Sequence, residues 1–255
     1  MKLNYELNPP KITKDGTFSF LSLKEDLYTF QSGAELLDGL VENIHLTDSV
    51  LGVPRISGIA AASHLKSNGK LHSTGLTCSL RTQDRSLLSI CQSVADAILL
   101  GIRGVLIVAG DDPKHKATYS VTMPSKIVKM LHTMRYDEEI EIELAIPNHI
   151  KQLSSIQGKI DARPNAFVTQ SIESLEALAR IVDIAHENKI RVIACVMIPC
   201  KKNEPSARII GLNWAQYKDN PIEFVKEAGA LAEEVLLTSP NNFNAGLQLL
   251  EQLNK

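Results

Sequence analysis

The chain has 255 residues, a formal net charge of -2 and a hydrophobic share of 44%. This length suits one large α/β barrel better than two small domains, and the hydrophobic share is ample for a packed core. A charge so close to neutral does not indicate a surface for nucleic acid or for anionic membranes, so neither is expected as a partner.

The cysteines and the amino-terminal segment indicate a cytoplasmic protein. Cys78, Cys91, Cys195 and Cys200 have no spacing typical of a zinc site or a disulfide framework, so free thiols and no bound metal are expected. The first segment, MKLNYELNPP, contains no apolar signal core, and no uninterrupted apolar stretch is long enough to span a bilayer. We therefore expect a soluble, cytoplasmic protein.

Segments with strand character alternate with segments of helical periodicity along the whole sequence. The expected strands are residues 2–8, 44–49, 73–79, 104–109, 141–147, 166–170, 191–199 and 234–238. The expected helices are residues 28–41, 55–65, 87–100, 127–134, 149–157, 171–186, 205–232 (with a break near Asn220-Pro221) and 246–253. These eight units predict a single (β/α)8 TIM barrel over residues 1–255, with a doubly wound sheet as the alternative.

The central strand, residues 104–109, is an unbroken apolar run that ends in Gly110-Asp111-Asp112-Pro113. Such a run is typical of a strand that helices cover on both faces. Its acids follow the carboxyl end, which is where barrels bind ligands. A plain turn and helix cap at Gly110-Asp111 is an equally open interpretation.

Polar side chains also gather at the ends of other expected strands. They are Glu6, Thr47, Asp48, Ser49, Thr77, Cys78, Thr169, Gln170, Thr238 and Asn241, and Lys159 precedes the sixth strand. Each is more typical of a turn or a surface when taken alone, but together on one rim they favour a small-molecule site. The sequence contains no G-x-G-x-x-G, P-loop, HExxH or GxSxG motif, so a nicotinamide-binding Rossmann domain is unsupported.

Several motifs occur in an order that resembles one family. Residues 47–113 contain TDSVLGVPRISGIAAAS, LTC, DRSLLS, LLGIRGVL and GDDP; YELNPPK lies near the start, and NAFVTQ lies on the sixth expected strand. This series resembles the methylenetetrahydrofolate reductase family, the flavoprotein barrels of one-carbon metabolism. The likeness is strong in the first half of the chain and thin after residue 199.

The resemblance implies reduction of 5,10-methylenetetrahydrofolate, or a related methylene-pterin, to the 5-methyl form by hydride transfer via a flavin. Glu6 matches the general acid, which protonates a folate nitrogen so that the five-membered ring opens to an iminium ion. Asp111 matches the carboxylate whose negative charge stabilises that cation. A proton donor, a nearby carboxylate and a hydride-supplying cofactor are what this chemistry requires.

The resemblance also implies a cofactor site and a substrate site. The positions that match cofactor contacts are Thr47, Asp48, Thr77, Cys78, Gly110, Asp111 and Lys159, and those that match substrate contacts are Glu6, Asp111 and Gln170. FAD is the implied cofactor, while FMN or no tightly bound flavin stays open. The electron donor can be NADH, NADPH or a reduced partner protein, the carrier a folate or a methanopterin-type pterin, and the likeness implies a homo-oligomer.

Four departures from the family pattern leave other functions open. Gly75 stands where the family has a His, Ala109 where an Arg often precedes Gly-Asp, and Asn241 about where an Arg is usual. Residues 79–83 resemble an insertion. Two alternatives therefore remain, namely a pterin-dependent methyl-transfer barrel without redox chemistry and a non-catalytic barrel partner that has lost its cofactor contacts.

Overall fold

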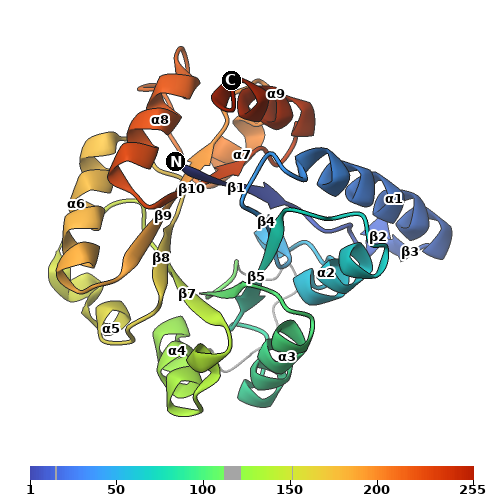
Figure 1. Ribbon diagram of the computed structural model, residues 1–255, viewed down its shortest axis with the longest axis horizontal. Coiled ribbons are helices and arrows are strands. Elements are labelled where there is room, and N and C mark those ends of the chain that lie inside the picture. Colours follow the sequence, from blue (N-terminus) through green and yellow to red (C-terminus); the bar gives the residue numbers. More distant parts are fainter. Residues whose placement is uncertain (15, 112–121, 151) are drawn as a thin grey trace.

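Eight parallel strands close into a barrel at the centre of the molecule (Figure 1). The computed structural model describes residues 1–14, 16–111, 122–150 and 152–255. The barrel strands are β1 (Lys2–Leu7), β4 (Asn43–Leu46), β5 (Gly75–Arg81), β6 (Gly104–Val108), β7 (Glu141–Ile146), β8 (Ala166–Thr169), β9 (Arg191–Met197) and β10 (Glu234–Thr238). Because β1 pairs with both β10 and β4, the sheet has no open edge; the predicted (β/α)8 TIM barrel is confirmed, and the doubly wound alternative is wrong.

A ring of helices covers the outside of the barrel (Figure 1). They are α1 (Phe20–Leu37), α2 (Gly58–Ser67), α3 (Leu87–Leu99), α4 (Pro124–Thr133), α5 (Gln157–Ile160), α6 (Leu175–Glu187), α7 (Glu204–Ile209), α8 (Pro221–Leu231) and α9 (Phe243–Leu253). The 3-10 turns are η1 (Val50–Gly52), η2 (Tyr136–Glu138) and η3 (Leu153–Ser155), and β2 (Thr13–Lys14) pairs with β3 (Thr17–Phe18) in a small hairpin that the sequence did not predict. Within the described ranges, no helix has the length and apolar character needed to cross a membrane.

Helix boundaries differ from the prediction where a serine caps the helix. α1 begins at Phe20 rather than at residue 28, because the Ser19 side chain accepts a hydrogen bond from the Ser22 backbone. α6 begins after Ser174, whose side chain accepts from the Ala177 backbone, and not at Ser171. The segments predicted at 205–232 and 149–157 are each divided into shorter helices and turns.

Side chains alternate between the barrel interior and the layer under the helices. On β6, Val105 and Ile107 join the large outer core, whereas Leu106 faces inward with Val168, Ile193 and other residues of a small inner core. The inner core is short, so polar side chains occupy the barrel interior on both sides of it.

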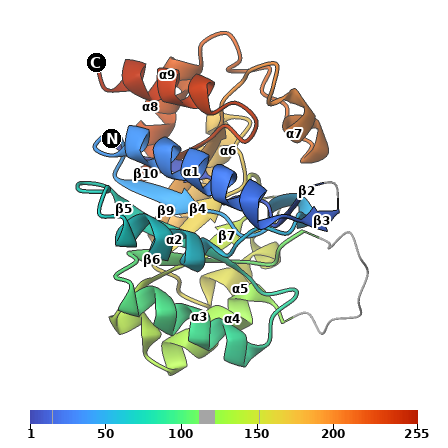
Figure 2. The same ribbon diagram turned by 90° about the vertical axis from the view of Figure 1, so that its right-hand side faces the viewer.

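The carboxyl ends of the strands meet at one end of the barrel, which we call the mouth. The β2–β3 hairpin and α7 lie at this end, and both chain termini lie at the opposite end, which we call the base (Figure 2). Ligand sites of (β/α)8 barrels form at the carboxyl ends of the strands, so the mouth is where the site is sought.

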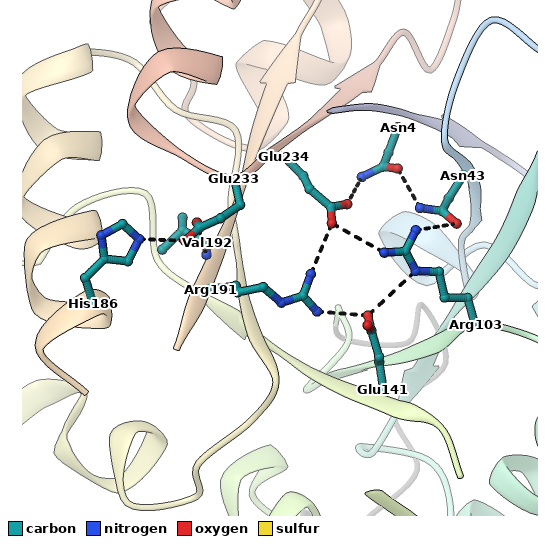
Figure 3. Close-up of polar contacts among 9 residues, drawn as sticks. All are labelled: Asn4, Asn43, Arg103, Glu141, His186, Arg191, Val192, Glu233 and Glu234. Atoms are coloured by element: carbon teal, nitrogen blue, oxygen red, sulfur yellow. Dashed lines mark hydrogen bonds and ion pairs between the residues drawn. The ribbon is translucent and has the colours of Figure 1, made fainter. Parts of the chain in front are cut away.

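Ion pairs close the base (Figure 3). Arg191 pairs with Glu234 at 3.1 Å and with Glu141 at 2.9 Å, and Arg103 approaches the same two carboxylates at 3.8 and 3.9 Å. The Asn4 amide donates a 2.7 Å hydrogen bond to Glu234. These side chains come from β1, β7, β9, β10 and the residue before β6, so the network joins strands that are distant in sequence.

Glu143 is buried beside this network and is only 4% exposed. Among the described residues its carboxyl group has no hydrogen bond or ion pair. Burial, followed by the charges of Glu141 and Glu234, raises the pKa of Glu143 to about 8, although Arg191 and Arg103 oppose the shift. Glu143 is therefore mostly protonated at neutral pH.

Candidate functional site

Glu6, at the mouth end of β1, is the acid best placed for chemistry. Its Oε1 accepts a 2.7 Å hydrogen bond from the Thr238 hydroxyl group on the adjacent strand β10. Burial raises the pKa of Glu6, while the hydrogen bond from Thr238 and the charge of Arg55 act against that rise. Glu6 therefore keeps its proton to a higher pH than an ordinary Glu, as a general acid must.

Arg55 comes from a strap formed where the segments after β1 and β4 run side by side. The backbone of Ile12 donates to Pro54 O and that of Ile56 to Pro10 O, each at 3.1 Å, and Arg55 Nη1 donates to Pro9 O at 2.6 Å. The Arg55 Nε is buried, and no hydrogen-bond acceptor is found for it among the described residues. A cation with an unused donor close to Glu6 suits an oxygen of a bound molecule.

Thr47 and Asp48 lie directly after β4, at the strand end where they were predicted, but both side chains bind other protein groups. The Thr47 hydroxyl donates to Asn8 Oδ1 at 2.8 Å. Asp48 pairs with Arg85 at 2.8 Å and accepts from the Arg81 backbone at 3.2 Å. Both side chains are buried, and their contacts join the loops of the mouth to one another.

Thr77 and Cys78 do not end their strand, and that prediction is wrong. Strand β5 continues to Arg81, because its alternating pattern persists beyond the expected end at residue 79. Thr77 lies inside the barrel, 2.8 Å from Nδ1 of His45. Cys78 points outward against Gly58 of α2, so its side chain is directed away from the mouth, and burial raises its thiol pKa to about 12.

His45 lies inside the barrel below the mouth. Its two ring nitrogens contact the hydroxyl groups of Thr77 and Ser79, both at 2.8 Å. Burial lowers the pKa of His45 to about 4, so the ring is neutral at physiological pH.

Asp111 is fixed at the mouth by its neighbours. Its Oδ2 accepts a 2.6 Å hydrogen bond from the backbone N–H of Leu51, and its carbonyl oxygen accepts from Arg81 Nη2 at 2.8 Å. The Asp111 side chain is exposed, as a ligand-binding carboxylate must be. The preceding Gly110 has a φ of 93°, and a Cβ there would lie 2.8 Å from Arg81 Cζ. Asp112 and Pro113, which the sequence placed in the same motif, lie outside the described residues.

Lys159 and Gln170 also reach the mouth. Lys159, on α5, donates through Nζ to the carbonyl oxygen of Ala145. Ala145 lies on the inner face of β7, near the carboxyl end of the strand. Burial lowers the pKa of Lys159. Gln170 directly follows β8 and its side chain is exposed. The structure thus brings Glu6, Asp111, Lys159 and Gln170 to one end of the barrel.

The departures from the family pattern lie in different places. Gly75 is the first residue of β5, at the base, where a Cβ would collide with Asn43, so this change is remote from the mouth. Asn241 hydrogen-bonds Asn203 and Ser206 beside α7. Ala109 is exposed directly after β6.

The sequence reasoning missed Arg55 and Arg81. Arg55 lies within the motif TDSVLGVPRISGIAAAS, but a loop has no periodicity that would predict which of its side chains turns inward. Arg81 could have been found, because Thr77, Ser79 and Arg81 alternate with outward-facing Leu80 and Cys78 as one continuous strand.

A flavin nucleotide requires hydrogen-bond donors for its phosphate and ring oxygens. Lys159 has one described acceptor for its three N–H groups, and Arg55 Nε has none. These donors, with the exposed Gln170 amide, fit an anionic, carbonyl-rich group. Cys78 does not fit a flavin site, because its side chain is directed away from the mouth. The polar groups of Thr47, Asp48 and Thr77 already bind protein partners.

The fold and the mouth together define a (β/α)8-barrel protein with a polar site at the carboxyl ends of its strands. No family model and no curated protein sequence matches the chain. The solved structures that it resembles include EDTA monooxygenase (EmoA) from Chelativorans sp. BNC1, at 12% identity over 99% of this chain and 92% of the other, with a TM-score of 0.69. A mutant of the tryptophan synthase α-subunit from Pyrococcus furiosus is similar at 13% identity over 99% and 97% of the two chains, with a TM-score of 0.59. At such identities the likeness shows the barrel fold.

Proposed function

We propose that this barrel is an oxidoreductase that reduces a methylene-pterin, 5,10-methylenetetrahydrofolate or a related carrier, to its 5-methyl form. The observation that carries the proposal is Glu6, a carboxyl group with a raised pKa at the mouth, hydrogen-bonded to Thr238. The ordered motifs that resemble the methylenetetrahydrofolate reductase family support it. EDTA monooxygenase, by its name also an oxidoreductase, shares the barrel fold.

Glu6 acts as the proton donor in this proposal. Its proton passes to the ring nitrogen that bridges the one-carbon unit, the carbon–nitrogen bond breaks, and the five-membered ring opens to an iminium ion. The Thr238 hydroxyl group holds the carboxyl group in place from the neighbouring strand. Burial helps to keep the acid protonated until the substrate binds, and this effect is larger than the opposing effects of the Thr238 hydrogen bond and the Arg55 charge.

Asp111 stabilises the positive charge that this step creates. Its carboxylate is exposed at the mouth and is oriented by the Leu51 N–H at 2.6 Å. A carboxylate fixed before the reaction stabilises a developing cation without reorganising during the step. Gln170 and the unused Arg55 Nε are the described donors available for the pterin oxygens.

A bound flavin, FAD or FMN, would supply the hydride for the iminium carbon. Lys159 is the side chain that would hold the anionic part of the flavin, because its ammonium group has three N–H donors and one described acceptor. NADH, NADPH or a reduced partner protein would restore the reducing equivalents. A homo-oligomeric state stays a prediction from the family resemblance.

A second candidate is a pterin-binding barrel that transfers a methyl group without redox chemistry. The engaged state of Thr47 and Asp48 and the outward direction of Cys78 favour it, because these were positions assigned to the cofactor. The two candidates differ in whether the protein retains a flavin.

Absorption spectra of the purified protein, before and after addition of FAD and FMN and then desalting, distinguish the two. Retained flavin bands, followed by formation of 5-methyltetrahydrofolate when 5,10-methylenetetrahydrofolate is added after NADH or NADPH, or a chemical reductant, has reduced the bound flavin, would support the reductase. Glu6→Gln should abolish pterin reduction and spare flavin reduction, and Glu138→Gln, at an exposed ion pair with Arg135, is the control. A protein that retains no flavin would favour a flavin-independent reductase, methyl transfer or a non-catalytic role. Pterin reduction that survives Glu6→Gln would rule out Glu6 as the acid.

A further inference from the structure

Arg81 is a buried cation that touches three loops of the mouth. Its side chain is 3% exposed. Nη1 donates to Ser49 O at 3.1 Å in the loop after β4, and Nη2 donates to Asp111 O at 2.8 Å in the loop after β6. In the loop after its own strand it pairs with Asp84 at 3.1 Å. One guanidinium group therefore joins the ends of β4, β5 and β6.

The loops that it joins contain backbone in the left-handed region. Ser49 has a φ of 47°, Leu51 of 56° and Gly110 of 93°. Glycine adopts such a conformation readily, but for Ser49 and Leu51 it persists only where the surrounding contacts determine it. Arg81 binds the carbonyl oxygen of Ser49 on one side and lies against Gly110 on the other, while Leu51 binds the Asp111 carboxylate.

We propose that Arg81 is the positioning residue for Asp111, and that it acts by fixing the two loops between which the Leu51–Asp111 hydrogen bond forms. The catalytic consequence rests on the proposed function. A planar guanidinium group can bind acceptors in several directions at once, which the ammonium group of a lysine does less well. Arg81 does not itself contact a substrate, because its donors point to protein acceptors and its side chain is enclosed.

Ala109 gives this arrangement its context. In the family that the motifs resemble, an Arg often precedes the Gly-Asp pair, and this chain has Ala109 there. Here the guanidinium group beside Gly110 comes from β5, the strand paired with β6. The chain thus holds the Asp111 loop from a neighbouring strand.

The test measures the position of Asp111 separately from activity. In Arg81→Lys and Arg81→Met, the Leu51 amide should exchange with water at least about tenfold faster by NMR, as it should in Asp111→Ala, because a charge-assisted hydrogen bond is lost. Arg135→Met, at an exposed ion pair, is the matched control and should leave that amide unchanged. Arg81→Lys keeps the charge and serves if Arg81→Met does not fold.

Activity gives the second readout. The Arg81 variants should lower kcat for pterin reduction more than they raise KM, and combining Arg81→Lys with Asp111→Asn should lower kcat no further than Asp111→Asn alone. An unchanged Leu51 amide in both Arg81 variants would overturn the positioning role even if the reductase is active. A faster Leu51 exchange in a protein without reductase activity would overturn the proposed function and leave the positioning role standing.

Discussion

The Thr238 hydroxyl group donates a 2.7 Å hydrogen bond to Oε1 of Glu6, joining the last strand of the barrel to the first at the mouth. This contact is between residues at opposite ends of the sequence, and it exists because the barrel closes. It favours the charged form of Glu6, whereas burial favours the neutral form and is the larger effect. The balance between the two determines the pH range in which Glu6 can donate a proton.

Replacing Thr238 with Val should shift that range upward. The substitution removes a hydrogen bond that lowers the pKa of Glu6, so the pKa rises further and the alkaline limb of the kcat/KM profile moves to higher pH. We expect kcat to fall by about tenfold at neutral pH, because the carboxyl group loses its orientation. The pH profile of pterin reduction is the measurement, and Thr133→Val, at an exposed position of α4, is the control. An alkaline limb that stays in place would show that Thr238 does not affect the acid.

Replacing Lys159 with Met should weaken the binding of an anionic cofactor. The substitution keeps the apolar stem and removes the ammonium group at the mouth. We expect affinity for FMN, measured by flavin fluorescence quenching, to fall by about 10- to 100-fold, the range for a hydrogen bond to a charged group. Lys129→Met on α4 should have no effect. Equal affinities for the wild type and Lys159→Met would remove Lys159 from the cofactor site.

Glu143 should make the protein less stable as the pH rises. Its pKa is about 8 in the folded chain against 4.5 for an ordinary Glu, so the folded state binds more protons between these limits. The free energy of unfolding therefore decreases as the pH rises from about 4.5 to about 8, and it levels off above that range. Glu143→Gln keeps the shape of the neutral acid and should remove this dependence.

Urea denaturation at several pH values measures the effect. The variant should gain stability over the wild type at pH 8 and lose that advantage toward pH 5. Glu251→Gln, at an exposed position of α9, is the control. Parallel pH curves for the wild type and Glu143→Gln would mean that Glu143 is charged in the folded protein.

Replacing Gly110 with Ala should destabilise the mouth. Gly110 has a φ of 93°, and a Cβ would lie 2.8 Å from Arg81, so the substitution adds a steric collision to an unfavourable backbone conformation. We expect the free energy of unfolding to fall by about 1–3 kcal/mol. Two controls separate the causes, since Gly39 has a φ of 79° with open space around it and Gly158 has neither constraint. If the free energy of unfolding falls no more than in Gly39→Ala, the unfavourable backbone conformation accounts for the whole effect and the collision with Arg81 adds nothing.

The sequence was sufficient for the barrel because each strand and helix has a local signal. The apolar run at 104–109 and the amphipathic pattern at 87–100 are local signals, and both elements form nearly where they were predicted. The end of β5 was missed because its last residue, Arg81, is a charged side chain that is buried in the fold, beyond the expected end at Ser79. Their side chains are satisfied by His45 and by the loop carbonyl groups, which the sequence alone does not place nearby.

The candidate site was predicted in part, and the reason is geometric. Glu6, Asp111, Lys159 and Gln170 lie near strand ends, and closure of the barrel brings such ends together. Arg55 depends on how one loop crosses another, which no pattern in the sequence specifies. The charged residues at the base, such as Glu141 and Arg191, resemble ordinary surface charges until their partners 50 residues apart are brought together.

The base network also makes the two chain ends depend on each other. Asn4 and Glu234, separated by 230 positions, hydrogen-bond there, and Glu234 in turn neutralises Arg191. A chain cut before β10 would lose the strand that pairs with β1 and would also leave Arg191 without one of its two carboxylates. Shortening this protein from its carboxyl end therefore opens the closed barrel and removes part of the base network at the same time, so a fragment that lacks β10 is a poor starting point for grafting the mouth onto another scaffold.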